Sequence, residues 1–357
     1  MTNIDKIIDL RSDTVTSPSP EMREAIYTAK VGDHGYGDDK TTIELEAYCA
    51  DLFGKESALL MTSGTMSDQI AIRCYTQPGD EIVLDRSYHI NYFQAGPSTD
   101  LGKVLLNLCD AEGGILTPED IEEAITGKYR GELFNRATLL CLENTINGYG
   151  GRIFPLENLK KIFTYAGMKG LPVHMDGERF LNACIATKIS PREYAKYTDS
   201  ISTSFSKGLG APFGSILMGS RSLIQKAAKY RKWYGGALHQ SGFMAAAAMY
   251  AIQNNVQRLE VDHRNARLLA VLLGAEDYFD IDLQVVETNM VMLSTKKLNL
   301  ESSHFVDLCR NEGVLLYPWS QYTVRAVSHL DVSEKDIAVA AEKIIQVSKN
   351  ILNGTIP

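Results

Sequence analysis

The stretch DSISTSFSKGLGAPFGS, residues 199–215, decides how the rest of the chain is interpreted. Its first part, residues 200–205, is typical of a β-strand and delivers Ser206 and Lys207 into a segment of Gly, Ala and Pro. That segment cannot continue a strand, because glycine adopts unusual backbone angles and Pro212 fixes a turn. A lysine at the end of a buried strand can lose its proton on desolvation and then attack a carbonyl group. A lysine in a surface turn is the alternative interpretation, and the stretch alone leaves both open.

Length, charge and cysteine content exclude several classes of protein. The 357 residues exceed what one hydrophobic core usually organises, so we expect two domains. A formal net charge of -8 argues against a nucleic-acid-binding surface. The start MTNIDKIIDLRSD is too acidic for a signal peptide, and no window approaches the roughly 18–20 apolar residues that span a membrane. The six cysteines are scattered without a CxxC pair, which is typical of reduced core thiols and favours a cytoplasmic protein.

Apolar runs and helical stretches alternate along most of the chain. The candidate strands are residues 58–61, 81–84, 104–108, 138–142, 172–175, 201–205 and 215–218, and the candidate helices include residues 21–30, 42–53, 117–125, 156–166 and 245–248. This alternation predicts an α/β fold with a mostly parallel seven-stranded sheet between helices. From about residue 250 the pattern changes to a helix, strands at residues 281–286 and 290–294, and further elements up to a last helix at residues 333–352. We therefore expect a large α/β domain at residues 1–249 and a smaller α+β domain at residues 250–357.

The segment MTSGTM, residues 61–66, follows a candidate strand and opens a helix. Ser63, Gly64 and Thr65 would present backbone N–H groups and hydroxyls at the positive end of that helix, which suits a phosphate group. A plain turn between a strand and a helix is the alternative interpretation.

Asp176 ends an apolar strand in the segment VHMDGER, residues 173–179. An ionised carboxylate at a buried strand end is costly unless it meets a positive partner. The protonated pyridine nitrogen of pyridoxal phosphate is such a partner, and this pairing strengthens the cofactor as an electron sink. The alternative role is a helix N-cap, for which aspartate is well suited.

Two further side chains have the chemistry that such a cofactor site needs. His89, in DRSYHINYF, can stack on a planar ring, although a packed histidine is the alternative. Arg325, in TVRAVSH, can hold a carboxylate through two parallel hydrogen bonds, although an exposed edge-strand arginine is the alternative. A phosphate turn, a stacking histidine, an aspartate, a lysine and a late arginine follow one another in the order that a pyridoxal-phosphate enzyme needs. The combination favours that function.

Over almost its whole length the chain resembles the threonine aldolase / β-eliminating lyase family of fold-type-I pyridoxal-phosphate enzymes. The motifs that carry the resemblance are DLRSDTVTSP, VGDHGYGDD, TSGTMSDQIA, LENT, HMDGERF, SFSKGLGAPFGS and RKWYGGALHQSG. The resemblance implies that Lys207 forms the Schiff base, that Asp176 pairs with the pyridine nitrogen and that His89 stacks on the ring. It also implies a cofactor-binding set of Ser63, Gly64, Thr65, Arg179 and Ser206, and a substrate-binding set of Ser12, Tyr36, Arg179 and Arg325. We add His34 and His239 to the candidate substrate-binding residues, although the family does not carry them. Tyr36 matches a loop tyrosine that the family contributes across a subunit interface, so we expect a homodimer or homotetramer with shared active sites.

The chain departs from the family at residues expected around the substrate's side chain, while the cofactor-binding residues are all kept. Leu133 is the best match to a family histidine that handles the β-hydroxyl group, and Ile146 replaces a second histidine. His239 replaces an arginine, and the segments GDHGYGDD and DGER introduce His34 and Glu178.

These features predict a lyase that cleaves a β-hydroxy-α-amino acid, such as L-threonine or L-allo-threonine, to glycine and an aldehyde with pyridoxal 5′-phosphate. β-Elimination or amino-acid racemisation on the same cofactor is the alternative, which the missing histidines favour, because a lysine can remove the α-proton without a further histidine. A catalytically silent scaffold is a third interpretation, and the intact Lys207 and Asp176 argue against it. We expect a small amino-acid substrate, no nucleic-acid or membrane partner, and no metal, because no ligand cluster predicts one.

Overall fold

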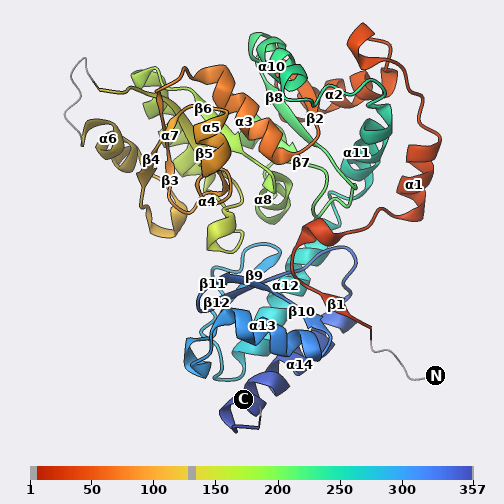
Figure 1. The fold of residues 1–357 in the computed structure, drawn as a ribbon, viewed down its shortest axis with the longest axis vertical. Coiled ribbons are helices and arrows are strands. Elements are labelled where there is room, and N and C mark those ends of the chain that lie inside the picture. The colour runs from red at the N-terminus through yellow and green to blue at the C-terminus, as the bar shows by residue number, and fades with distance from the viewer. Residues whose placement is uncertain (1–5, 128–133, 356–357) are drawn as a thin grey trace.

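The computed structural model describes residues 6–127 and 134–355, which form a large part and a smaller part (Figure 1). The large part, at the top of Figure 1, surrounds a seven-stranded sheet, and the smaller part surrounds a three-stranded sheet. Helix α12 (Leu259–Gly274) lies in the smaller part, at the side that faces the large one.

The central sheet of the large part contains the seven strands that the sequence predicts. Their bounds are β2 (Ser57–Met61), β3 (Glu81–Asp85), β4 (Leu105–Cys109), β5 (Ala137–Glu143), β6 (Val173–Asp176), β7 (Ser200–Ser204) and β8 (Ser215–Gly219). The strand order is β2-β8-β7-β6-β5-β3-β4, and only β8 runs antiparallel to its neighbours β2 and β7. The inner strands β3, β6 and β7 are buried along their whole length, as expected for a sheet covered on both faces, whereas the edge strand β4 is partly exposed. The predicted mostly parallel α/β fold is therefore confirmed.

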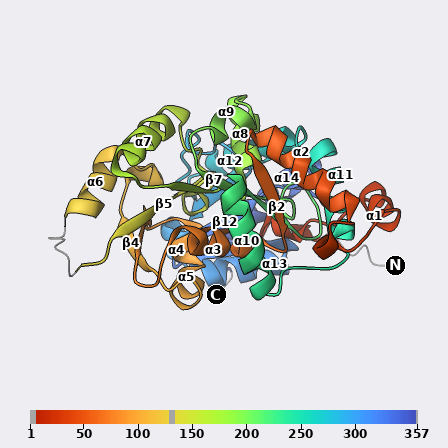
Figure 2. The same ribbon diagram turned by 90° about the horizontal axis from the view of Figure 1, so that it is seen from above.

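Helices lie on both sides of this sheet. Seen from above, α7 and α9 lie on one side and α3, α5 and α10 on the other (Figure 2). The α6 helix begins as its sequence predicts, with Thr117 and Asp120 in a reciprocal capping box and Pro118 at the first position. The helices of the large part are α1 (Pro20–Tyr27), α2 (Lys40–Phe53), α3 (Gly64–Tyr75), α4 (His89–Tyr92), α5 (Ala95–Asp100), α6 (Pro118–Thr126), α7 (Leu156–Lys169), α8 (Phe180–Thr187), α9 (Pro191–Ala195), α10 (Arg221–Trp233) and α11 (Gly242–Asn254).

The smaller part combines segments from both ends of the chain. Its antiparallel sheet has the order β11-β12-β9, and β1 pairs in parallel with β10 in a separate two-stranded sheet. The bounds are β1 (Ile8–Asp9), β9 (Met290–Ser294), β10 (Val314–Leu315), β11 (Tyr317–Ser320), β12 (Thr323–Val327), α13 (Ser302–Asn311) and α14 (Glu334–Leu352). Short 3₁₀ helices lie in loops of both parts, at Asp13–Val15, His34–Tyr36, Glu112–Gly114, Asn147–Tyr149 and Lys296–Leu298.

The strand predicted at residues 281–286 is wrong. The Asp282 carboxylate accepts a hydrogen bond from the Gln284 N–H at 2.8 Å, and the Asp282 carbonyl accepts one from the Val285 N–H at 3.3 Å. These local bonds close a turn, which the backbone adopts in place of an extended strand. The alternating apolar residues instead pack as single side chains against the core of the smaller part.

Two large clusters of buried apolar side chains follow the two parts. One cluster runs from Met22 to Leu259, and the other joins Ile8 and Leu10 to residues from Ala266 to Val347. The proposed division into domains at residues 1–249 and 250–357 stays a prediction. The six cysteines are all buried and unpaired. Among residues 6–127 and 134–355, no helix has both the length and the apolar character needed to cross a membrane.

Candidate active site

Three neighbouring strands of the central sheet end at the same edge and bring the predicted site together. Glu143 ends β5 and Asp176 ends β6, and the two residues are register partners in the parallel ladder. The chain leaving β7 carries Lys207 to this edge. Carboxyl ends of parallel strands are where open α/β sheets place their ligands.

The turn after β7 fixes the backbone around Lys207. The Gly210 N–H donates to the Lys207 carbonyl at 2.9 Å, and the Ala211 N–H donates to the Phe205 carbonyl at 2.9 Å. Gly210 has a φ of 78°, and a Cβ there would lie 2.5 Å from the Leu330 side chain. Only glycine fits that conformation and that space, so the prediction of a special turn is borne out locally.

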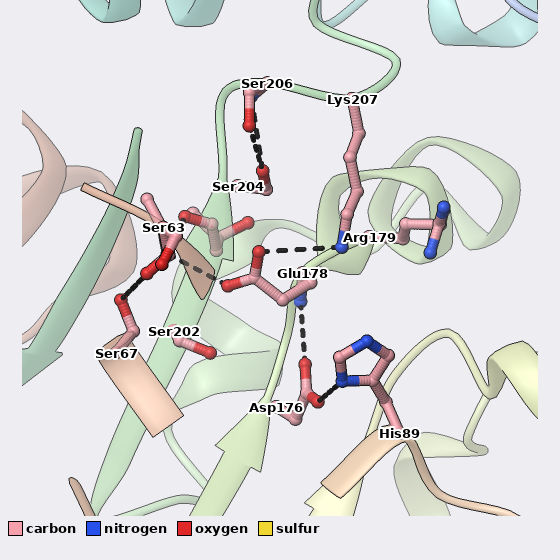
Figure 3. A network of polar contacts seen from close by, with 12 residues as sticks. Ser63, Ser67, His89, Asp176, Glu178, Arg179, Ser202, Ser204, Ser206 and Lys207 are labelled. Atoms are coloured by element: carbon pink, nitrogen blue, oxygen red, sulfur yellow. Dashed lines mark hydrogen bonds and ion pairs between the residues drawn. The ribbon is translucent and has the colours of Figure 1, made fainter. Parts of the chain in front are cut away.

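The Lys207 amine lies inside the site and faces an acid. Its Nζ atom is 3.6 Å from Oε2 of Glu178, and the two side chains are 16% and 8% exposed (Figure 3). The Lys207 carbonyl also accepts a hydrogen bond from the Thr16 hydroxyl at 3.1 Å, which ties the lysine turn to the N-terminal segment. Lys207 is thus held by its backbone while its amine stays within reach of the site.

Asp176 has one carboxylate oxygen with a partner and one without. Its Oδ1 accepts from the Glu178 N–H at 3.3 Å, whereas Oδ2 is buried and has no hydrogen-bond partner in the described part of the chain. Burial, reinforced by the carboxylates of Asp68 and Glu178, raises the pKa of Asp176 well above its usual value. A buried acceptor of this kind stabilises the protein only when it meets a donor or a positive charge.

His89 lies beside Asp176 at the start of α4. Its Nδ1 is 3.9 Å from the Asp176 Oδ2 and 2.8 Å from the Gln94 Nε2, and its backbone N–H donates to Glu143 at 2.5 Å. Burial, and then the charge of Lys207 and other cations, lowers the pKa of His89 to about 3. The ring is therefore neutral at any ordinary pH. Burial also raises the pKa of Glu143 well above its usual value, with a further contribution from Asp176.

Arg179 is paired with an acid that the sequence did not single out. Its Nε and Nη2 donate to the two Asp13 oxygens at 2.9 and 2.6 Å, a parallel pair of charged hydrogen bonds. Burial alone would raise the pKa of Asp13, but Arg179 outweighs burial and lowers it well below its usual range. Asn289 donates to Asp13 as well, at 3.2 Å. Arg179 is thus fixed and charge-compensated beside Lys207 (Figure 3).

Arg325, on β12 in the smaller part, lies close enough to Arg179 and Asp13 for their charges to act on its guanidinium. It donates from Nη1 to Asn147 at 2.9 Å and from Nη2 to the Arg11 carbonyl at 3.2 Å. Its carbon Cζ lies 5.1 Å from the ring centres of both Tyr317 and Trp319. Burial and the nearby Arg179 lower the pKa of Arg325 to about 10. In the described residues Arg325 has no carboxylate partner at ion-pair distance, and its buried Nε has no hydrogen-bond partner, so the guanidinium can receive a carboxylate ligand.

The predicted phosphate turn lies at the start of α3, and a carboxylate rests against it. Ser63 caps the helix by accepting from the Met66 N–H at 3.3 Å. A Cβ at Gly64 would lie 2.1 Å from Glu178 Oε2, so the Glu178 carboxylate touches the backbone of the helix end. Glu178 also accepts from the Ser215 hydroxyl at 2.9 Å. The first turn of α3 therefore already accommodates an anionic group, as the positive end of a helix favours.

The other residues that the sequence analysis singled out differ in how they relate to Lys207 and Asp176. Ser206 shares a 3.2 Å hydrogen bond with Ser204 beside Lys207, Thr65 is exposed in the first turn of α3, and Ser12 accepts from the Thr14 N–H next to Asp13. Leu133 lies outside the described residues. Ile146 is fully buried in the core, where it offers no polar atom to the site.

His34, Tyr36 and His239 gather in a different place. They line a cavity of about 490 Å³, together with Arg231 and other residues of the 31–39 and 231–239 segments. The His34 N–H donates to the His239 carbonyl, and the His239 ring contacts Asp33 at 2.9 Å. In the described residues this cavity shares no lining residue with the cavity beside Lys207. Within one chain, these three predicted substrate-binding residues are not brought to the lysine.

Sequence reasoning missed four acids or amides of the site, namely Asp13, Asp68, Gln94 and Glu143. Glu143 carries the signal that identified Asp176, an acid at the end of an apolar strand, and could have been found in the same way. Asp13 stands in the RSD segment beside Ser12, where only its partner Arg179, 166 residues away, shows its role.

The fold and the site together define the class of the protein, an α/β protein of the fold-type-I class with a lysine at the carboxyl edge of its sheet. The structure matches a putative L-allo-threonine aldolase from Listeria monocytogenes with a TM-score of 0.77 at 22% identity, covering 96% of each chain. It matches a threonine aldolase from Leishmania major with a TM-score of 0.81 at 19% identity, covering 96% of this chain and 99% of the other. At these identities the likeness shows the fold.

The family model of the β-eliminating lyases matches residues 9–297. The chain belongs to the β-eliminating lyase family. It is 38% identical over 335 residues to the low specificity L-threonine aldolase of Escherichia coli K12, covering 94% of this chain and 97% of the relative. It is 36% identical to a probable low-specificity L-threonine aldolase 2 of Arabidopsis thaliana, covering 93% and 94% of the two chains.

Proposed function

We propose that the protein is a pyridoxal-phosphate-dependent lyase that cleaves a β-hydroxy-α-amino acid of the L-threonine type to glycine and an aldehyde. The family, and the threonine aldolase names of relatives at 36–38% identity, support this assignment. The observation that carries it is Oδ2 of Asp176, which is buried, has no hydrogen-bond partner among the described residues and lies 3.9 Å from His89 on the same sheet edge as Lys207. A protonated pyridine nitrogen would supply the missing donor.

The residues present fit pyridoxal phosphate in three respects. The Asp176 oxygen that lacks a partner among the described residues matches the ring nitrogen, and Nδ1 of the neutral His89 ring lies 3.9 Å from that oxygen, so both side chains would contact one cofactor ring. The N-terminus of α3 already accommodates the Glu178 carboxylate, and the cofactor's phosphate is the stronger anion for the same helix end. Glu178 would then have to turn away from Gly64 when the phosphate binds.

Each site residue has a proposed role toward the cofactor. Lys207 would hold it covalently, and Arg179, fixed by Asp13, would face its phenolate oxygen. The proposed phosphate ligands are the Ser63–Thr65 turn and Ser206. When bound, the cofactor supplies an electron sink for a bond broken at the substrate's α-carbon.

The chain's own residues orient the substrate. Arg325 lies over the rings of Tyr317 and Trp319 and lacks a carboxylate partner in the described residues, so it is the proposed clamp for the substrate carboxylate, with Ser12 beside Asp13 as a second contact. Arg179 is less available for this task, because its Nε and Nη2 donate to Asp13. A bidentate arginine fixes rotation about the substrate's α-carbon and thereby decides which bond can break.

β-Elimination remains a second candidate because of one observation at residue 146. The family's second histidine is replaced by an isoleucine that is 0% exposed, so no base can act from that position. Removal of an α-proton needs only a lysine amine, and Lys207 supplies one at the sheet edge that also carries Asp176.

The separate position of His34, Tyr36 and His239 supports a homo-oligomer. These residues lie at another cavity of the same chain, and Tyr36 is 85% exposed. We propose that this segment serves the site of a second copy, as the family resemblance implies for Tyr36. Gel filtration with light scattering should give at least twice the 39.5 kDa chain mass. A strictly monomeric protein that is fully active would refute the shared site.

A substrate panel tests the function directly. The protein loaded with pyridoxal phosphate is incubated with L-threonine, L-allo-threonine, L-serine and L-alanine, with Lys207→Ala as the matched control. Equal amounts of glycine and acetaldehyde from the threonines support the proposal. Pyruvate and ammonia from serine show β-elimination, and solvent deuterium at the α-carbon with loss of chirality shows racemisation; either result without glycine refutes the aldolase assignment.

A further inference from the structure

Gln94 is a buried carboxamide that joins His89 to a second buried acid. It is 1% exposed, and its Nε2 lies 2.8 Å from Asp68 Oδ2 and 2.8 Å from His89 Nδ1. Its Oε1 accepts from Gln69 Nε2 at 2.9 Å. The nitrogen of the Gln94 amide therefore contacts a carboxylate and an imidazole, whereas its oxygen contacts another amide.

The carboxylate of Asp68 decides which way the Gln94 amide faces. Asp68 is fully buried, and Oδ1 accepts from the Ser202 hydroxyl at 2.9 Å and faces His174 Nε2 at 3.3 Å. A carboxylate only accepts hydrogen bonds, so the Gln94 group that faces Oδ2 must be the NH₂ group. The acceptor Oε1 is then left for the Gln69 amide, which agrees with the observed contact.

The same NH₂ group settles the protonation of the His89 ring. An amide nitrogen carries two hydrogens and accepts none, so its second hydrogen points at His89 Nδ1. A proton on Nδ1 would place two donors 2.8 Å apart. The other neighbour of Nδ1, Asp176 Oδ2, is 3.9 Å away and too far for a hydrogen bond that would oppose this arrangement.

We propose that Gln94, oriented by Asp68, holds His89 as the neutral tautomer with its proton on Nε2. Figure 3 shows the second ring nitrogen directed away from Asp176 and toward the side where Arg179 and Lys207 lie. His89 thus presents an N–H donor to the site and no free acceptor nitrogen. Gln94 and Asp68 are positioning residues, since they act through His89.

The consequence for catalysis rests on the proposed function. It limits which group can accept the proton of the substrate's β-hydroxyl. A retro-aldol cleavage needs an acceptor for the β-hydroxyl proton. With its proton on Nε2, His89 donates a hydrogen bond to a substrate oxygen and does not accept that proton. The acceptor is then a bound water or another base, which leaves His89 as a stacking and orienting group.

The tautomer is measurable without turnover. Histidine-labelled ¹⁵N protein, with and without pyridoxal phosphate, is examined at pH 8.5 by long-range ¹H–¹⁵N correlation, and His89 is assigned by its loss in His89→Phe. The pH lies above the pKa of Asp68, which burial raises to about 7. The proposal expects an unprotonated Nδ1 and a protonated Nε2. A protonated Nδ1, or a doubly protonated ring, overturns it.

Two variants and a control separate the Gln94 effect from general disruption. Gln94→Glu places an acceptor opposite Nδ1, so the proton should move to Nδ1. Asp68→Asn removes the charge that orients the amide, so a mixture of tautomers should appear. Thr99→Ala, on the exposed side of α5, should leave the wild-type pattern. An unchanged Nε2–H tautomer in a folded Gln94→Glu protein contradicts the proposal, whereas failure to release glycine from threonine contradicts only the proposed function.

Discussion

Replacing Glu178 by alanine should tighten the binding of pyridoxal phosphate. In the structure, the Glu178 carboxylate touches the start of α3 at Gly64, accepts from Ser215 at 2.9 Å and lies 3.6 Å from Lys207 Nζ. The cofactor's phosphate is expected at the same helix end, so the carboxylate has to leave first. The alanine variant has no carboxylate to displace.

The magnitude follows from the contacts that Glu178 loses. A hydrogen bond to a charged group contributes about 1.5–3 kcal/mol to stability. Because every ~1.4 kcal/mol is tenfold in a dissociation constant, losing the Ser215 contact and the Lys207 ion pair corresponds to roughly ten- to a hundredfold. The Kd of the cofactor for Glu178→Ala should fall by about that factor.

Equilibrium dialysis of the purified protein against pyridoxal phosphate measures this Kd. Glu178→Gln is the matched control, since it keeps the size of the side chain and a group that can accept from Ser215 while losing the negative charge. Its Kd should fall between those of the other two proteins. An unchanged or weaker affinity of Glu178→Ala would show that Glu178 does not compete with the phosphate, and the proposed position of the phosphate would then be wrong.

Three further variants test other parts of the account. Arg325→Lys keeps the charge but loses the two parallel hydrogen bonds of an arginine, so KM for threonine should rise about ten- to a hundredfold. Initial rates measure this KM, and dialysis should show little change in cofactor affinity. A rise in KM below twofold would exclude Arg325 as the carboxylate clamp. Burial raises the pKa of Glu46 to about 7, so the folded protein keeps a proton that the unfolded chain loses near pH 4.5. The contribution of Glu46 to the free energy of unfolding therefore falls as pH rises from about 4.5 to about 7. Glu46→Gln should therefore gain up to about 3 kcal/mol over the wild type between pH 4.5 and pH 8 in urea melts, and a pH-independent difference would contradict the assignment. Gly210→Ala forces a Cβ to 2.5 Å from Leu330 at a φ of 78°, so the free energy of unfolding should fall by about 1–3 kcal/mol, and a neutral effect would mean that the turn relaxes freely.

Most strands of the large sheet could be predicted because they are short apolar runs between turn residues, whereas β7 is mainly Ser and Thr. Strands buried on both faces need no alternating pattern, and the intervening helices force parallel pairing. In segment 281–286 the apolar residues do alternate, and this pattern predicted a strand that the structure does not have. Its period of two came from single side chains packing against the small core, while Asp282 bound the backbone in a turn. Local hydrogen bonding outweighed the pattern.

Site residues with a distinctive local setting could be found in the sequence, and those defined by a distant partner could not. Lys207 and Asp176 stand at strand ends, where their chemistry is unusual enough to notice. Asp13 becomes meaningful only through Arg179, and Gln94 only through its contacts with Asp68 and His89. The sequence showed Glu178 as a departure from its family, but only the structure shows that its carboxylate reaches Gly64.

The covalent position of the cofactor tests the central claim most directly. The protein is loaded with pyridoxal phosphate, reduced with borohydride, digested and examined by peptide mass spectrometry, with Lys207→Arg treated in parallel. We expect one modified peptide that carries the reduced cofactor on Lys207, and no such peptide from the variant. Modification of a different lysine, or no stable adduct on the wild-type protein, would contradict it.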